Sequence, residues 1–169
     1  ELAALGDIYV NDAFSAAHRA HASTEAIARL LPAAAGRLMQ QELEALAGAL
    51  ENPAHPVAAL VGGAKVSTKM AVLGNLIPKV DLIVIGGGMA NTFLVAQGYT
   101  VGKSLLEQDR VEDATRIMKV AEKKGVELLL PTDVLVAKEV TRGAEHKVVP
   151  VKKIPNSWSA VDIGPDSRE

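Results

Sequence analysis

The sequence contains no cysteine, which excludes disulfide bonds and thiolate chemistry and fits a reducing cytoplasm. Aromatic residues make up only 3% of the 169 residues, so a core must be built from valine, leucine, isoleucine and alanine. The chain also lacks an apolar run near the ~18 residues that a membrane-spanning helix needs, and it opens without a signal-peptide pattern. We therefore expect a cytoplasmic protein without a membrane partner.

Neither positive nor negative charge is in strong excess. The formal net charge is −2, and basic residues do not gather in the kind of patch that a nucleic-acid or membrane partner requires. Apolar residues at 49% and charged residues at 22% are instead typical of a globular protein. The length allows one domain or parts of two.

Short apolar runs alternate with helical patterns in the part of the chain that follows Pro56. This alternation predicts an α/β fold with a doubly wound, Rossmann-like parallel sheet. The expected strands are residues 57–61, 81–85, 126–130, 134–136, 147–151 and 160–163. The expected helices are residues 67–76, 89–97 and 111–124, the last followed by Gly125.

The longest helical pattern lies earlier, from Ala33 to Leu50, where apolar residues recur at spacings of three and four. Asn52-Pro53 should end this helix, which is long enough to link two domains. Before it we expect the end of a helix at 2–5, a strand at 7–10, and a loop or irregular helix at 11–24.

A first candidate site is the segment Val61-Gly62-Gly63-Ala64-Lys65-Val66-Ser67-Thr68-Lys69, where an apolar strand runs into paired glycines. Glycines let the backbone approach a ligand, and the N–H groups at a helix start favour phosphate oxygens. Lys65 and Lys69 would share one face of a helix that covered both. Two solvated lysines after an ordinary turn explain the segment equally well, and it does not match the P-loop pattern GxxxxGK[ST].

A second candidate is Ile85-Gly86-Gly87-Gly88-Met89-Ala90-Asn91, again between a strand and a helix. Three glycines leave a bare surface for an adenine ring or a diphosphate, although close packing of the helix on the sheet is the simpler explanation. The dinucleotide fingerprint GxGxxG fails because Asn91 stands where it needs glycine. Two glycine-rich strand ends in succession favour a ligand site, since open α/β sheets bind ligands there.

A third candidate holds His18, Arg19 and His21, in the segment that starts at Asn11. The planar fork of Arg19 suits phosphate or carboxylate, but a solvated basic loop is the interpretation that the residues alone favour. A zinc site lacks further ligands at suitable spacing. Asp133 and Asp162 follow or end strands, and we expect them to cap turns rather than hold Mg²⁺.

Five segments together resemble the phosphoglycerate kinase family in order and spacing. They are DIYVNDAFSAAHRAHAS at 7–23, VGGAKVSTK at 61–69, IGGGMANTF at 85–93, LLLPTD at 128–133 and IPNSWSAVDIGPDS at 154–167. The resemblance covers essentially the whole chain. It implies a hinged two-domain kinase that moves a phosphoryl group between 1,3-bisphosphoglycerate and ADP, giving 3-phosphoglycerate and ATP.

The resemblance also assigns roles to parts of the chain. Residues 1–32 would end an N-terminal phosphoglycerate-binding domain, 33–51 would be the interdomain helix, and 52–169 would begin a domain for MgADP or MgATP. Arg19 would grip the phosphoglycerate beside His18 and His21. Lys65 and Lys69 would face the transferring group and the nucleotide phosphates. The other residues similar to the nucleotide site are Gly62, Gly63, Ala64, Gly87, Gly88, Leu105, Val140, Ser159, Ala160 and Val161.

Parts of the family pattern are not found in the chain, including most of the basic patch and the turn with the Mg²⁺-binding aspartate. We therefore expect an internal piece that is inactive alone, from an enzyme that is a monomer when complete. In that enzyme Lys65 and Arg19 would neutralise charge across a closing hinge. A non-catalytic nucleotide-binding α/β module would use the same glycine-rich strand ends without Arg19. A Rossmann dehydrogenase is disfavoured by the failed fingerprint.

Overall fold

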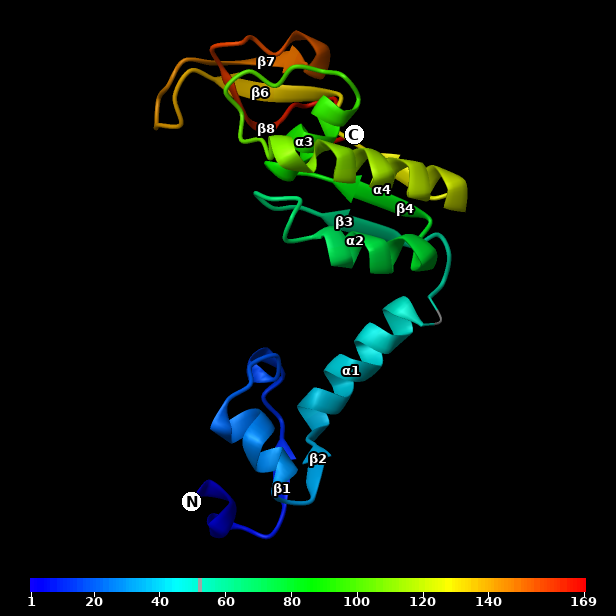
Figure 1. Cartoon of the computed structure of the whole chain (residues 1–169), viewed down its shortest axis with the longest axis vertical. Coiled ribbons are helices and arrows are strands. Elements are labelled where there is room, and N and C mark those ends of the chain that lie inside the picture. The colour runs from blue at the N-terminus through cyan, green and yellow to red at the C-terminus, as the bar shows by residue number, and fades with distance from the viewer. Residues whose placement is uncertain (52) are drawn as a thin grey trace. The chain divides into compact units, whose positions relative to one another are not determined.

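The computed structural model describes residues 1–51 and 53–169 and divides the chain into two compact units, Glu1–Ala54 and His55–Glu169 (Figure 1). The predicted helix stop at Asn52-Pro53 falls partly on Asn52, which lies outside the described residues. No helix in the described part of the chain combines the length and the apolar character needed to cross a bilayer.

The first unit is built on one pair of short parallel strands and one long helix. Strand β1 (Tyr9–Asn11) pairs with β2 (Ala33–Ala35), and α1 (Arg37–Leu50) follows. Single turns of 3₁₀ or π helix fill the rest: η1 (Leu2–Leu5), η2 (Phe14–Ala16), η3 (Ala22–Ala26) and η4 (Ile27–Arg29). Among the described residues of this unit, Met39 is the only buried large apolar side chain.

The prediction of a helix from Ala33 onward is wrong for its first turn. Ala33 to Ala35 form β2, and the chain enters the helix only after Gly36, whose backbone is extended (φ −74°, ψ 173°). Alanine favours helices, but here β1 supplies a parallel partner, and the Gly36 N–H donates to the Asn11 carbonyl at 2.8 Å. Tertiary pairing thus overrides local propensity.

The second unit contains the predicted parallel sheet. Strands β3 (Ala58–Val61), β4 (Leu82–Ile85) and β5 (Glu127–Leu129) lie in the order β3-β4-β5. They are connected through α2 (Met70–Leu76) with η5 (Ile77–Lys79), and through α3 (Met89–Ala96), η6 (Gln108–Arg110) and α4 (Val111–Lys124). The strands, α3 and α4 lie within about two residues of the predicted positions.

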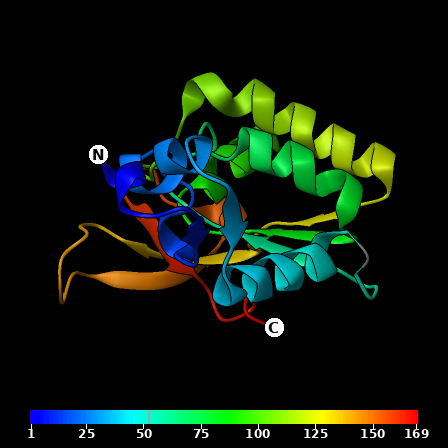
Figure 2. The ribbon, with the colours of Figure 1, turned by 90° about the horizontal axis from the view of Figure 1, so that it is seen from below.

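One face of the parallel sheet carries the main core. Val61, Ile83 and Ile85 are buried on this face together with Leu73 of α2, Phe93 of α3 and Ile117 of α4. Figure 2 shows α2 and α4 side by side over it. The strand residues of opposite parity are more open, and Leu60 is 81% exposed. In the described residues, the helices therefore cover one face of the sheet.

The last three strands form a separate antiparallel sheet. Strands β6 (Asp133–Ala137), β7 (His146–Pro150) and β8 (Ser159–Ile163) lie in the order β7-β6-β8, with η7 (Val151–Lys153) between β7 and β8. Helix α3 lies between the two sheets (Figure 1): its Phe93 belongs to the first core, and its Leu94 packs with Val136 and Trp158 in a second. Strands were predicted here, but not their antiparallel pairing, which a short β6–β7 connection makes possible.

Helix α2 begins three residues later than predicted, at Met70 instead of Ser67. The residues before it form a turn: the Lys69 N–H donates to the Val66 carbonyl at 2.8 Å, and the Thr68 hydroxyl donates to the Lys65 carbonyl at 3.0 Å. Serine and threonine compete for backbone groups in this way and delay a helix start. The helix therefore covers neither Lys65 nor Lys69.

Candidate functional site

Two glycine turns meet at the carboxyl ends of β3 and β4, which are neighbours in the parallel sheet. The Gly86 N–H donates to the Val61 carbonyl at 3.0 Å, and the Met89 N–H donates to the Gly63 carbonyl at 2.9 Å. The two predicted glycine-rich segments are thus hydrogen-bonded to each other. Their position is where open α/β sheets bind ligands.

Side chains are excluded at the centre of these turns. Gly87 has φ +67°, and a Cβ there would lie 2.9 Å from the Gly63 carbonyl oxygen. A Cβ at Gly88 would lie 2.9 Å from Leu105 Cδ2 and 3.3 Å from the Ala64 carbonyl oxygen. Glycine is needed at Gly87, where φ is positive and the backbone of Gly63 lies close, whereas a Cβ at Gly88 would displace the end of the Leu105 side chain and crowd Ala64. Leu105 and Ala64 consequently lie against Gly88.

The turn between β3 and α2 carries the two predicted lysines. Val66 is completely buried between them and anchors the turn, while Lys65 is exposed and Lys69 is half-buried. The Lys69 side chain folds back over the glycine turn, with Cε 3.8 Å from where a Cβ of Gly63 would be. A cation held over bare backbone is suited to an anion that also takes hydrogen bonds from that backbone.

Glu107 braces this turn from the loop that follows α3. Its Oε2 accepts from the Ser67 N–H at 3.0 Å, and its Oε1 accepts from the Ser67 hydroxyl at 2.6 Å. These hydrogen bonds, helped by the nearby charge of Lys65, lower the pKa of the Glu107 carboxyl. Glu107 was not predicted from the sequence, because its partner Ser67 lies 40 positions away and no local pattern joins the two residues.

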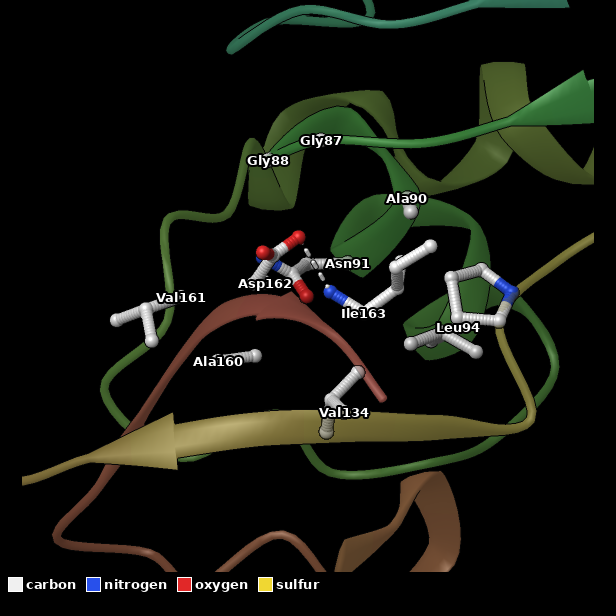
Figure 3. A pocket seen from close by; sticks show the side chains of 11 residues that line it. Gly87, Gly88, Ala90, Asn91, Leu94, Val134, Ala160, Val161, Asp162 and Ile163 are labelled. Atoms are coloured by element: carbon white, nitrogen blue, oxygen red, sulfur yellow. Dashed lines mark hydrogen bonds between the residues drawn. The ribbon is translucent and has the colours of Figure 1, made fainter. Parts of the chain in front are cut away.

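A cavity of about 100 Å³ opens beside the second glycine turn (Figure 3). Its walls come from the turn, α3, β6 and β8, and its lining includes Gly87, Gly88, Asn91, Ala160, Val161 and Asp162. Ligand pockets usually measure about 300–1,000 Å³, so this cavity holds only part of a nucleotide-sized ligand. Gly87 and Gly88 leave one wall without side chains, as a flat ring would require.

Most of the predicted nucleotide-binding residues lie close together, and Val140 lies apart from them. Ser159 precedes Ala160 in β8, whose N–H donates to the Ser104 hydroxyl at 2.8 Å. Asn91, absent from the predicted set, is buried and donates from Nδ2 to the Leu105 carbonyl at 3.0 Å. Val140, in contrast, is 81% exposed and lines a different hollow, near the β6–β7 connection.

The predicted substrate residues lie in the first unit on an exposed loop. Arg19 Nε lies 3.4 Å from His18 Nε2, and the Arg19 carbonyl accepts from the Thr24 hydroxyl at 2.6 Å. The same hydroxyl accepts from the His21 N–H at 3.1 Å. Thr24 thus fixes the backbone at both ends of the bend from Arg19 to His21, and the Arg19 side chain lies at the surface.

Asp133 caps a turn, as expected. It is 4% exposed, and it accepts from the Asp166 N–H at 3.2 Å and from the Ser167 N–H at 2.9 Å. Burial alone would raise the pKa of Asp133, but these hydrogen bonds and that of the Ser167 hydroxyl outweigh it and lower the pKa. Among the described residues, no group of three or more histidine, aspartate or glutamate side chains could hold a metal ion.

The family model described as phosphoglycerate kinase matches residues 1–169. Two similar relatives carry the name phosphoglycerate kinase. That of Rhodospirillum centenum is 62% identical over 169 residues, which is 100% of this chain and 43% of the relative. That of Moorella thermoacetica is 57% identical over 167 residues, which is 99% of this chain and 42% of the relative.

Solved structures of phosphoglycerate kinases also resemble this chain. The phosphoglycerate kinase of Coxiella burnetii superposes with a TM-score of 0.90 at 48% identity, covering 98% of this chain and 43% of that one. The enzyme of Pyrococcus horikoshii superposes with a TM-score of 0.80 at 30% identity, covering 98% of this chain and 42% of that one. The chain thus spans about 43% of the length of such relatives.

Proposed function

Since the chain belongs to the phosphoglycerate kinase family, we propose that its protein transfers a phosphoryl group between 1,3-bisphosphoglycerate and ADP, giving 3-phosphoglycerate and ATP. The observation that carries the proposal is the pair of hydrogen-bonded glycine turns with Lys69 folded over one of them. Backbone N–H groups and a cation together are the features that a chain of phosphates needs.

The nucleotide half of the proposal uses the second unit. The adenine ring would enter the cavity beside Gly87 and Gly88, against the β8 residues Ala160 and Val161. The phosphates would run toward the turn of Lys65 and Lys69, with Gly62, Gly63 and Ala64 beneath them. Leu105 lies against Gly88 and would meet the ring edge. Ser159, the first residue of β8, would belong to the same slot, and Val140 contributes only if its connection moves.

The substrate half uses the exposed loop of the first unit. Arg19 would bind phosphoglycerate with its bidentate fork, and His18 and His21 would add donors. The linker role of α1 and the closing of one unit on the other belong to this proposal. Closure would bring the two substrates together and exclude water.

The reaction requires that the two substrates are positioned for transfer, and it does not require a general base. In ATP formation an ADP oxygen attacks the phosphorus of the acyl phosphate, and the carboxylate of 3-phosphoglycerate leaves. The attacking oxygen is already anionic and the carboxylate leaves as a stable anion with the electrons of the broken P–O bond, so no proton has to be removed or supplied. Lys65 and Arg19 would neutralise charge on the transferring group.

The proposal also includes Mg²⁺ as companion of the nucleotide, a monomeric state and a cytoplasmic location. The described residues hold no cluster that fits a metal ion, so no residue of this chain is assigned to Mg²⁺ and no step depends on it.

A coupled assay on the full-length product of the gene tests the proposal. We expect ADP release that depends on both MgATP and 3-phosphoglycerate. Calorimetric binding of MgADP without turnover would instead support the competing function, a non-catalytic nucleotide-binding module. Absence of both binding and turnover would reject the two together.

A further inference from the structure

Glu107 links two segments of the candidate site that are far apart in sequence. It precedes η6, and its N–H donates to the hydroxyl of Thr92, at 3.3 Å; Thr92 lies in α3 and is 1% exposed. The backbone of Glu107 is thereby fixed to the helix that begins at the second glycine turn. Its carboxylate reaches the other way, to the turn of the two lysines.

The carboxylate contacts the lysine turn in a bidentate manner. Both oxygens accept hydrogen bonds from Ser67, one from the N–H and one from the hydroxyl. Ser67 lies two residues after Lys65 and two before Lys69, so a rotation of its peptide would redirect both side chains. Since α2 starts only at Met70, no helical hydrogen bond holds this N–H, and Glu107 takes the place of a helix cap.

The charges around Glu107 support an ionised carboxylate. The nearby positive charges are Lys65 in the turn and Arg110 in η6, and Arg110 itself pairs with Asp109 and Asp113. The neighbouring loop residues are tied to the site as well: the Leu105 carbonyl accepts from Asn91, and the Ser104 hydroxyl accepts from the Ala160 N–H. The loop from Ser104 to Glu107 therefore contacts the lysine turn, α3 and β8.

We propose that Glu107 is a positioning residue that holds the Lys65–Lys69 turn in the conformation that presents both ammonium groups to the nucleotide phosphates. This inference rests on the proposed function. It adds a residue that would contact neither substrate and acts through Ser67.

The test compares Glu107→Gln with Ser67→Ala and the control Glu112→Gln in the full-length product of the gene. Glu112 is an exposed carboxylate in the first turn of α4. Glu107→Gln keeps the size of the side chain but replaces one carboxylate oxygen by an amide NH₂ group. This donor would then face the N–H or the hydroxyl of Ser67, which is also a donor. We expect the Kd for MgADP to rise about tenfold in Glu107→Gln, the effect of one lost charge-assisted hydrogen bond. Ser67→Ala should give a smaller rise, and the control should stay within about twofold.

Two further measurements separate positioning from general stability. The KM for 3-phosphoglycerate should stay near wild type, and the double variant should bind MgADP no more weakly than Glu107→Gln alone, since both changes break the same contact. A lower melting temperature with an unchanged Kd for MgADP overturns the inference. If Glu107→Gln does not fold, an unchanged Kd in Ser67→Ala overturns it as well. A wild-type protein that binds no nucleotide rejects the proposed function itself, whereas normal variants of an active enzyme reject only the role of Glu107.

Discussion

Lys69 stands where the turn meets α2, with its side chain over the glycine backbone. We predict that Lys69→Ala weakens ATP binding by about 1–3 kcal/mol, because a charge-assisted hydrogen bond to a phosphate is lost. Calorimetry with MgATP measures this. Lys123→Ala, in the last turn of α4, removes an equal charge away from the site and should change nothing. If Lys69→Ala binds ATP as tightly as the wild type does, the assignment of Lys69 to the nucleotide site is wrong.

Lys65 lies closer to the end of β3 and is more exposed than Lys69. We predict that Lys65→Ala lowers kcat more than it raises the KM for ATP, because its charge would act on the transferring group. Steady-state kinetics over a range of ATP concentrations measures both quantities. A variant in which only KM changes would show that the two lysines have exchanged roles.

Arg19 differs from a lysine in the planar fork of its side chain. We predict that Arg19→Lys weakens 3-phosphoglycerate binding roughly tenfold while MgADP binding stays normal, because a point charge cannot make two parallel hydrogen bonds. Arg29→Lys is the matched control, since Arg29 is exposed in the same unit and pairs with Glu25. Equal 3-phosphoglycerate affinity in Arg19→Lys and wild type would reject the assignment.

Residues with purely local roles were the ones that the sequence could predict. Gly87 and Gly88 stand out because glycine between a strand and a helix signals close backbone approach, and the structure has that approach. Glu107 and Asn91 give no such signal, because each acts on a partner brought close only by the fold. The role of Val140 rested on the resemblance alone, and its side chain lies apart from the cavity.

At the scale of elements, the turn after β8 depends on one buried carboxylate. Asp133 opens β6 and accepts from Asp166 and Ser167, which holds the turn against the antiparallel sheet. Because the folded state lowers its pKa from the usual 3.8, the ionised form stabilises the fold above about pH 4. This contribution is lost as the pH falls through the lowered value.

We therefore predict that Asp133→Asn melts at a lower temperature than wild type at pH 7, and that the gap narrows as the pH falls below about 4. Thermal melts followed by circular dichroism across this range measure the gap. Asp166→Asn is the control, because only the backbone of Asp166 meets Asp133. A gap independent of pH would mean that the Asp133 charge does not hold the turn.

Elements were predictable where several local signals agreed. Helix α4 has acidic residues in its first turn, basic residues in its last, and Gly125 in the left-handed conformation (φ +71°), and its predicted bounds match. Strand β2 had no such signals, since three alanines resemble a helix until β1 pairs with them. The antiparallel sheet was missed because strand order and direction are set by packing around Trp158 and Val136, which no single segment encodes.

At the scale of the whole molecule, the two units differ in how much apolar surface they bury. The second unit has two cores, with Ile83, Ile85, Phe93 and Val136 completely buried. Among the described residues of the first unit, Met39 is the only large apolar side chain that is buried. Ile8, Val10 and Leu30 are each more than half exposed. Ile27, in the same unit, is half-buried.

This contrast predicts that the 169-residue chain by itself unfolds in two steps. Ordering a residue costs about 1–2 kcal/mol of backbone entropy, and the first unit has little apolar burial to offset it. Hydrogen exchange followed by mass spectrometry should show early exchange in β1, β2 and the Arg19 loop, and the slowest exchange in β4 and α3. With that loop unstable, the chain should turn over no 3-phosphoglycerate. One sharp transition with equal protection in both units would contradict this, because a unit so poor in core would then be as stable as one with two.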